Sequence, residues 1–343
     1  MSNVTPVQEI ADEIIEDALP ITVPQVFTPA WNGFGKQVGT VKNAAEAMVN
    51  ANLNWSVMLA DCGWQGTNNG QTSFYPSKGF VATVRSDSLA TLGIVSRKYK
   101  TVQNIDAFSF LDGLIGDGDM TVETAGVLDG GCKVWVLCNL PQVDEVADGD
   151  TSKRYLLFSN SHDGSSAVRC LPTSIRVVCQ NTLALALKQG DGEGVTVRHS
   201  GDINEKLIIA RNTLSLTLDI FDRHLADARK LVARAVTGDD VIGFLDRILP
   251  VPADKGNGRT LKLATREAIT SNFYAHPLQL LPSIKGTAWA LVNAATQHVD
   301  HAGRIRLTDG KTEAEARFNN SIYGTGAKVK RLAFDTAMEL FAA

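Results

Sequence analysis

The stretch MTVETAGVLDGGCKVWVLCNLP, residues 120–141, indicates the fold class of this chain. Two runs rich in Val, Thr and Leu flank Asp129-Gly130-Gly131, a pattern typical of a tight β-hairpin. Downstream, RYLLFSNSHDGSSAVRCLPTSIRVVCQNTLALAL at 154–187 predicts two further strands and then a helix from about Gln180. Upstream, alternating apolar and polar residues predict short strands within 56–62, 79–87 and 90–103.

Helical periodicity separates and follows these strands. Apolar residues recur at intervals of three and four within 42–52, 104–118 and 202–249, and further helices are predicted at 260–274, 284–302 and 311–341. The sequence therefore predicts an α+β fold, with an antiparallel β-sheet core, interspersed helices and a helical C-terminal half. We expect an acidic N-terminal arm at 1–30, an α+β core domain at 31–200, and a helical region at 201–343 that packs on the core.

The composition is that of a globular protein. Hydrophobic residues make up 44% of the 343 residues and charged residues 20%. No apolar run approaches the roughly 20 residues of a membrane span, and the N-terminus lacks the basic region and cleavage site of a signal peptide. Five cysteines, an odd number without a CxxC pair, favour reduced thiols over a disulfide framework. We therefore expect a cytoplasmic protein without a membrane partner.

The common catalytic signatures are absent from the sequence. It contains neither the phosphate-binding GxxxxGK[ST] loop nor the GxSxG nucleophile elbow. The nearest approach to a metal site consists of two short clusters, which comprise His162, Asp163, His298, Asp300 and His301. A hydrogen-bonded structural role is the commoner use of such residues. We expect no catalytic residue, no cofactor and no bound metal, and a metal-dependent enzyme built on these five residues is an alternative.

Charge is segregated along the chain. Residues 100–150 hold ten acidic and two basic side chains, whereas residues 151–235 hold eight acidic and twelve basic ones. A net charge of −4 is therefore compatible with a basic surface that binds nucleic acid.

We predict that this surface combines basic, aromatic and amide side chains near the strands and at the predicted helix start. The predicted residues are Arg85, Arg97, Lys98, Tyr99, Arg169, Arg176, Gln180, Asn181 and Thr182. Trp64, Phe74 and Tyr75 are further candidates for stacking on bases. The alternative is that Arg176 pairs with an acidic residue of 100–150 and that the aromatic residues lie in the core.

Four sequence blocks carry a family resemblance. They are LGIVSRKYKTVQNIDAFSFLDGL (92–114), SNSHDGSSAVRCLPTSIRVVCQNTLALAL (159–187), GTAWALVNAATQHVDH (286–301) and RFNNSIYGTGAKVKRLAF (317–334). In this order they resemble the phage/plasmid-like protein family, a family with a domain of unknown function that phages, plasmids and integrated elements carry. The resemblance spans roughly residues 25–340 and implies a mobile-element host.

The order of predicted elements is also similar to that of single-strand annealing proteins of the Red-beta and RecT type, which assemble into rings or helices on single-stranded DNA. This likeness is one of architecture and not of motifs. We expect a non-enzymatic protein that binds or anneals single-stranded DNA in recombination or replication. A counter-defence or regulatory protein that binds a host protein is the alternative.

A long apolar stripe predicts self-association. The stripe runs from Ile208 to Leu231 on the long predicted helix, and 317–341 offers a second amphipathic surface. Apolar surface of this extent is usually buried against another surface. We therefore expect a homo-oligomer that forms through the helical C-terminal half.

Overall fold

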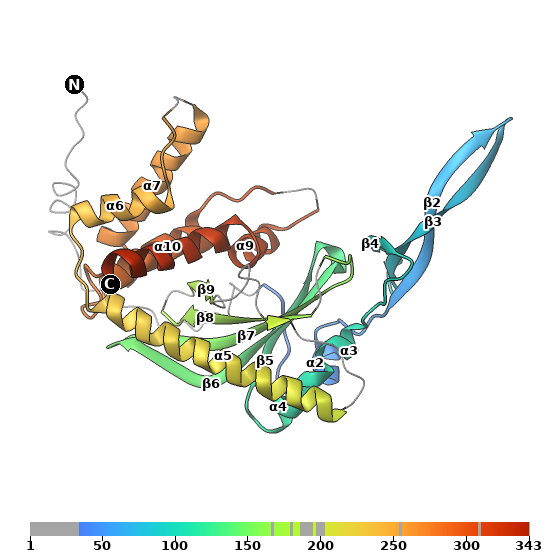
Figure 1. Cartoon of the computed structure of the whole chain (residues 1–343), viewed down its shortest axis with the longest axis horizontal. Helices are drawn as coiled ribbons and strands as arrows, with labels where there is room; N and C mark the ends of the chain where they lie inside the picture. The colour runs from blue at the N-terminus through green and yellow to red at the C-terminus, as the bar shows by residue number, and fades with distance from the viewer. Residues whose placement is uncertain are drawn as a thin grey trace.

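The computed structural model describes residues 34–165, 168–178, 181–185, 195–196, 203–253, 256–307 and 310–342. Antiparallel sheets occupy the N-terminal half and helices dominate the C-terminal half, so the predicted α+β class is confirmed (Figure 1). The predicted acidic arm at 1–30 lies outside the described residues. In the described part of the chain, no helix is both long enough and apolar enough to cross a membrane.

An antiparallel sheet, here called the core sheet, forms the centre of the molecule. Its strands follow the order β1-β5-β6-β7-β8-β10, and β9 also pairs with β8. Their bounds are β1 Lys36–Gln37, β5 Thr121–Leu128, β6 Lys133–Ala147, β7 Asp150–Ser161, β8 Arg169–Arg176, β9 Thr182–Ala184 and β10 Val195–Thr196. The predicted β5–β6 hairpin is confirmed, because Leu128 pairs with Lys133 and the three residues Asp129, Gly130 and Gly131 turn the chain with positive φ angles.

Helices cover both faces of the core sheet. Strand β6 directs Val134, Val136 and Cys138 to one face and Trp135 and Leu137 to the other, and all five side chains are buried. Figure 1 shows α5 lying across the sheet. Residues of α5 and of the short segments α2, α3, η2 and α4 pack on the first face, and residues of α9 pack on the second. The bounds are α2 Ala44–Asn50, α3 Asn104–Phe108, η2 Ser109–Leu111, α4 Asp112–Gly116, α5 Ile203–Val232 and α9 Glu313–Ile322.

A helical body continues from the C-terminal end of α5. Its core contains Phe244 of α6, Phe273 of α7, Trp289 of α8 and Ala337 of α10. A capping box between Thr237 and Asp240 fixes the start of α6, since each side chain accepts a hydrogen bond from the other residue's backbone N–H. The bounds are α6 Gly238–Ile248, α7 Asn257–Ala275, η4 Pro277–Gln279, α8 Ala288–Gln297, η5 His298–Ala302 and α10 Thr325–Phe341.

A second sheet projects from the body as a long β-hairpin with one additional strand (Figure 1). We call this sheet the arm; it consists of β2 (Val57–Asn68), β3 (Gln71–Arg85) and β4 (Thr91–Ser96). Asn69 and Gly70 connect β2 to β3 with φ angles of 50° and 80°. These left-handed angles are those of the tight turns that join hairpin strands, where Asn-Gly is the favoured pair. The three strands predicted in this region are confirmed, although β2 and β3 extend farther than the sequence pattern indicated.

One sequence prediction is wrong, and the apolar stripe behind another is partly covered within the chain. The helix predicted from about Gln180 is wrong, because Thr182–Ala184 is strand β9, paired with β8; Gln180 itself lies outside the described residues. Most of the apolar stripe of α5 packs within its own chain: Phe221 lies in the sheet core, Leu231 lies in the helical core, and Ile208 remains exposed. Packing within the chain therefore accounts for part of this stripe, and self-association through the C-terminal half stays a prediction.

Candidate nucleic-acid interface

The base of the arm carries a group of basic residues directly after β4. The guanidinium of Arg97 donates hydrogen bonds to the carboxylate of Asp61 at 2.7 Å and to the carbonyl of Ser77 at 2.9 Å, so it joins β2 and β3 to the end of β4. Lys98 and Lys100 follow with exposed side chains. In the part of the chain that the structure describes, neither lysine has an ion-pair partner within 4.0 Å.

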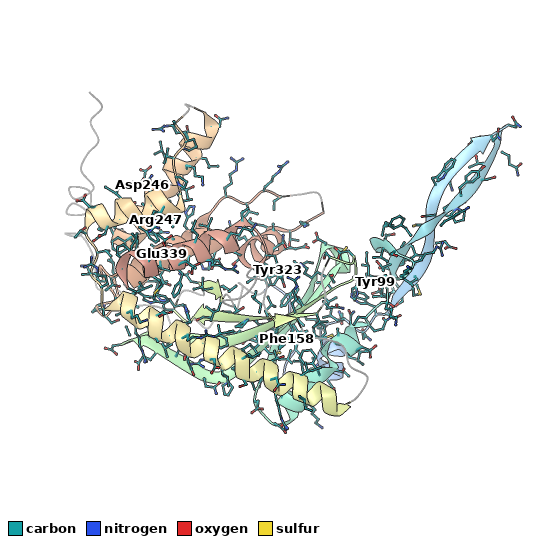
Figure 2. The ribbon with its side chains drawn as sticks, in the orientation of Figure 1. Tyr99, Phe158, Asp246, Arg247, Tyr323 and Glu339 are labelled. Atoms are coloured by element: carbon teal, nitrogen blue, oxygen red, sulfur yellow. The ribbon has the colours of Figure 1, made fainter. Side chains whose placement is uncertain are left out.

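Tyr99 connects these residues to the core sheet. Its hydroxyl donates a hydrogen bond to the carbonyl of Ser161 at 3.3 Å, and burial raises the pKa of the phenol. Ser161 is also paired with Lys133 across β6 and β7. Figure 2 labels Tyr99 near the base of the arm and Tyr323 on the body. The predicted residue Tyr99 is thus a half-buried link, and its neighbours Lys98 and Lys100 carry the accessible charge.

Two further basic side chains, those of Lys133 and Arg169, lie at the end of the core sheet where Tyr99 binds Ser161. The ammonium of Lys133 lies 4.1 Å from the ring centroid of Tyr323, a cation–π geometry. Burial lowers the pKa of Lys133, the carboxylates of Asp163 and Asp129 oppose this shift, and nearby Arg169 adds to it. We call the combined set the basic strip; it consists of Arg97, Lys98, Lys100, Lys133 and Arg169.

Four predicted residues thus lie on segments linked through Ser161 and Lys133, and they are Arg97, Lys98, Tyr99 and Arg169. Lys100 and Lys133 were missed. Lys133 follows a predicted turn, and alternation along β6 places it on the same face as Trp135. Only the pairing of β6 with β7, and of β7 with β8, shows that this face also carries Arg169. A single sequence does not contain that register.

Aromatic side chains lie on the outer part of the arm. Trp64 of β2 is 64% exposed, and Phe74 and Tyr75 of β3 are also exposed. The rings of Trp64 and Tyr75 stack with a centroid distance of 4.5 Å and an interplanar angle of 18°. The alternative that these aromatic residues lie in the core is therefore wrong for all three.

Arg85 fastens the arm to the body. Its guanidinium pairs with Asp87 at 2.7 Å, donates to the carbonyl of Gly130 at 2.8 Å, and lies 4.3 Å from the ring centroid of Trp55. These contacts join the arm to the β5–β6 turn. Arg85 was predicted to contact nucleic acid, but the structure gives its guanidinium a structural role within the chain.

The conspicuous SNSHDG stretch at 159–164 is a second fastening point. The hydroxyl of Thr83 in β3 donates to the carbonyl of His162 at 2.8 Å. The Cα of Gly93 in β4 lies so close to Asp163 that an added Cβ would meet the Cα of Asp163 at 2.6 Å. This turn therefore holds the arm sheet against the core sheet.

Arg176 does not face a polymer, and this prediction is wrong. Its side chain is 2% exposed and forms an ion pair with Asp150 at 2.5 Å. The guanidinium also donates to the side chain of Gln279 and to the carbonyl of Leu278. The alternative that Arg176 pairs with an acidic residue of 100–150 is thus confirmed, and nucleic acid cannot reach this side chain without unfolding.

Asn181 and Thr182 are also interior residues and not a helix start. The side-chain amide of Asn181 donates to the carbonyl of Asn293 at 3.0 Å, and the backbone N–H of Thr182 donates to Asp300 at 2.8 Å. Both residues are buried. Their predicted contact with phosphate is wrong, because a strand packed against α8 and η5 offers no free helical N–H groups.

The candidate metal ligands do not assemble. Asp300 accepts hydrogen bonds from Ser321, Thr182 and Lys330, whereas His162 lies beside Asn104 in another part of the molecule. Among the described residues, no group of three or more His, Cys, Asp and Glu side chains could hold a metal ion. Cys138 and Cys170 are fully buried, and burial raises the pKa of both thiols.

Comparison with known proteins gives a family but no activity. Residues 91–322 match the family described as a domain of unknown function, DUF932. The chain belongs to this family. The DUF932 match begins at β4 and ends at α9, so it includes strands β5 to β10 of the core sheet and the basic strip, and leaves β1, β2 and β3 outside. No curated protein and no solved structure matches the chain.

Within the DUF932 region, we expect His162 to make the fold sensitive to acid. His162 is fully buried, its Nε2 lies 2.8 Å from the side-chain oxygen of Asn104, and burial lowers the pKa of the imidazole from 6.5 to about 4. Below pH 6.5 the unfolded chain binds a proton at this residue while the folded chain does not, so the stabilisation present above pH 6.5 is lost as the pH falls toward 4. We expect His162 to lower the free energy of unfolding by about 2 kcal/mol between pH 7 and pH 5.

Urea denaturation at pH 7 and pH 5 checks this prediction. The matched variant is His162→Gln, which keeps a hydrogen-bond donor for Asn104 but has no titrating ring. The difference between the two pH values should be smaller in the variant by the contribution of His162. An equal pH dependence in both proteins would show that His162 takes up its proton freely in the folded state.

Proposed function

We propose that this chain binds single-stranded DNA along the arm and the basic strip, without enzymatic chemistry, in the service of a phage, plasmid or integrated element. One observation carries the proposal: exposed aromatic side chains lie on the outer part of a projecting hairpin, and exposed lysines lie at its base. Proteins that hold single strands combine these two features, because bases stack on aromatic rings while basic side chains follow the phosphates.

The spacing of the two features supports a short strand of nucleic acid. Asp61, which pairs with Arg97, precedes Trp64 by three residues along β2. At about 3.3 Å per residue, these positions are separated by about 10 Å. We propose that one strand of nucleic acid reaches both the ring of Trp64 and the basic residues at the base of the arm. The sequence resemblance to mobile-element proteins favours DNA as the polyanion.

Fluorescence anisotropy with labelled oligo-dT, across a series of salt concentrations, tests the proposal. Trp64→Ala should weaken binding by about 5- to 150-fold, since stacking contributes about 1–3 kcal/mol per base, and should leave the salt dependence unchanged. The double variant Lys98→Ala/Lys100→Ala should instead flatten the log–log salt slope by about 0.7 for each lost phosphate contact.

Lys285→Ala is the matched control, because Lys285 is an exposed lysine on the helical body. Its affinity and salt slope should equal those of the wild type. Failure of the wild-type chain to bind oligo-dT would overturn the proposal, and a protein partner would take the place of DNA. Binding that is insensitive to both arm variants would place the DNA on another surface.

A further inference from the structure

A cavity of about 360 Å³ lies where β9, α5 and α10 meet. Figure 1 shows these three elements in the body, apart from the arm. Much of the lining is apolar, because Leu183 and Leu185 line it from the β9 segment, Ile220 from α5 and Phe334 from α10. Pockets for small molecules typically measure about 300 to 1,000 Å³. The cavity therefore has the size that suits one small organic molecule.

His224 is the buried polar group of this cavity. The residue is 8% exposed, and its ring lies against Phe334 and Trp289, with centroid distances of 4.9 and 6.1 Å. No residue that the structure describes forms a hydrogen bond with either ring nitrogen. Burial lowers the pKa of the imidazole to about 4, so at pH 7 the neutral ring offers one donor and one acceptor. Buried polar groups are normally hydrogen-bonded, and the open cavity beside His224 is where a partner fits.

The charged residues of the cavity leave one cation without a carboxylate. Arg331 and Asp335 of α10 offset each other, because Arg331 opposes the rise that burial causes in the pKa of Asp335. Asp227 pairs with Lys230 at 2.7 Å. Arg223 is exposed, donates from Nε to a backbone carbonyl of its own helix, and forms no ion pair within the described part of the chain. Arg223 therefore offers an anion site at the solvent side of the cavity.

We infer that this cavity binds a mononucleotide, with its base against His224 and Phe334 and its phosphate at Arg223. A nucleobase has flat faces that pack on apolar and aromatic side chains, and an edge of donors and acceptors that suits His224 and Asp335. A lipid chain would leave His224 without a hydrogen bond. An inorganic anion would meet the carboxylates of Asp227 and Asp335 and leave most of the volume empty. The inference uses none of the residues proposed to bind DNA along the arm.

Isothermal titration calorimetry of the full chain with dAMP, dCMP, dGMP and dTMP tests the inference. At least one of the four should bind, and ribose 5-phosphate, which lacks the base, should bind about tenfold more weakly or less. Arg223→Ala should raise the dissociation constant of the nucleotide about tenfold or more and leave that of the matching nucleoside unchanged. The matched control is Arg211→Ala, which removes an exposed arginine from the same helix outside the cavity and should keep the wild-type affinity.

His224→Phe separates the role of the base from that of the phosphate. It keeps an aromatic ring and removes both ring nitrogens, so it should weaken nucleotide and nucleoside alike. Circular dichroism establishes that this variant folds, and the exposed Arg223 keeps the test decisive if it does not. The inference is overturned if no nucleotide binds at millimolar concentration, if ribose 5-phosphate binds as tightly, or if Arg223→Ala behaves like Arg211→Ala.

Two further arms separate this site from the arm and identify the source of the base. Trp64→Ala should bind the mononucleotide as the wild type does, so that either proposal can fail while the other holds. Displacement of the bound mononucleotide by an oligonucleotide of mixed sequence would identify a DNA strand as the source. Retention of the mononucleotide in the presence of that oligonucleotide would identify the free nucleotide as the ligand.

Discussion

Arg176→Ala should lower the free energy of unfolding by about 3 to 5 kcal/mol, the cost typical of removing one partner from a buried ion pair. The substitution leaves the carboxylate of Asp150 buried and without its counter-ion, with the indole N–H of Trp289 still donating to it at 2.8 Å. It also removes the contacts of the guanidinium to Gln279 and Leu278, which join β8 to the helical body. Urea denaturation followed by circular dichroism measures the loss.

The matched control is Arg247→Ala, which removes another arginine from an ion pair of similar length. Arg247 lies 2.7 Å from Glu339, and the two side chains are 47% and 63% exposed (Figure 2). Exposed pairs contribute about 0 to 1 kcal/mol, because water solvates each charge after the partner is lost. The contrast between the two variants isolates the effect of burial. Equal effects would contradict the buried role of Arg176, and a flattened salt slope for DNA binding in Arg176→Ala would restore its role as a phosphate contact.

The elements predicted correctly are those whose signal is local. Gly130 and Gly131 mark a turn by their identity alone, and the alternation within β3 and the three- and four-residue periodicity of α5 are each contained in a short window. Thr182–Ala184 was predicted as helix because its apolar run is too short to distinguish the two structures. Its strand conformation depends on β8, which lies earlier in the chain, and on Asp300, which lies 118 residues away.

The candidate interface shows the same division between local and distant information. Lys98 and Lys100 follow a predicted strand, and their exposure agrees with their type. Arg97 and Arg176 are both arginines beside strands, and only the fold shows that one is 43% exposed while the other is 2% exposed. Asp150 could be suspected as a partner of Arg176 from the excess of acidic residues in 100–150. Its identification required the register of β7 and β8.

Asp300, a candidate metal ligand by sequence, instead belongs to a buried cluster around Lys330. The ammonium of Lys330 is 1% exposed and donates to Asp300 at 2.6 Å, to the hydroxyl of Ser321 at 2.7 Å and to the carbonyl of Thr182 at 2.5 Å. Three donors thus meet three acceptors, which accounts for every N–H of the ammonium group. The cluster joins β9, η5, α9 and α10, four segments that are distant in the sequence.

Lys330→Met should therefore lower the free energy of unfolding by about 3 to 5 kcal/mol, although methionine fills a similar volume. The loss arises because Asp300 stays buried without its counter-ion and the carbonyl of Thr182 loses its donor. Lys328→Met is the control: Lys328 lies on the same helix with an exposed side chain, so its replacement should change the free energy of unfolding by less than about 0.5 kcal/mol.

Urea denaturation measures both variants, and hydrogen exchange at the amide of Thr182, which donates to Asp300, gives a local readout. Faster exchange at that amide in Lys330→Met, with unchanged exchange in the arm, would place the defect at the junction of β9 with the helices. A Lys330→Met protein as stable as Lys328→Met would instead show that the apolar surroundings compensate for the lost ion pair, and that the cluster contributes specificity of packing and not stability.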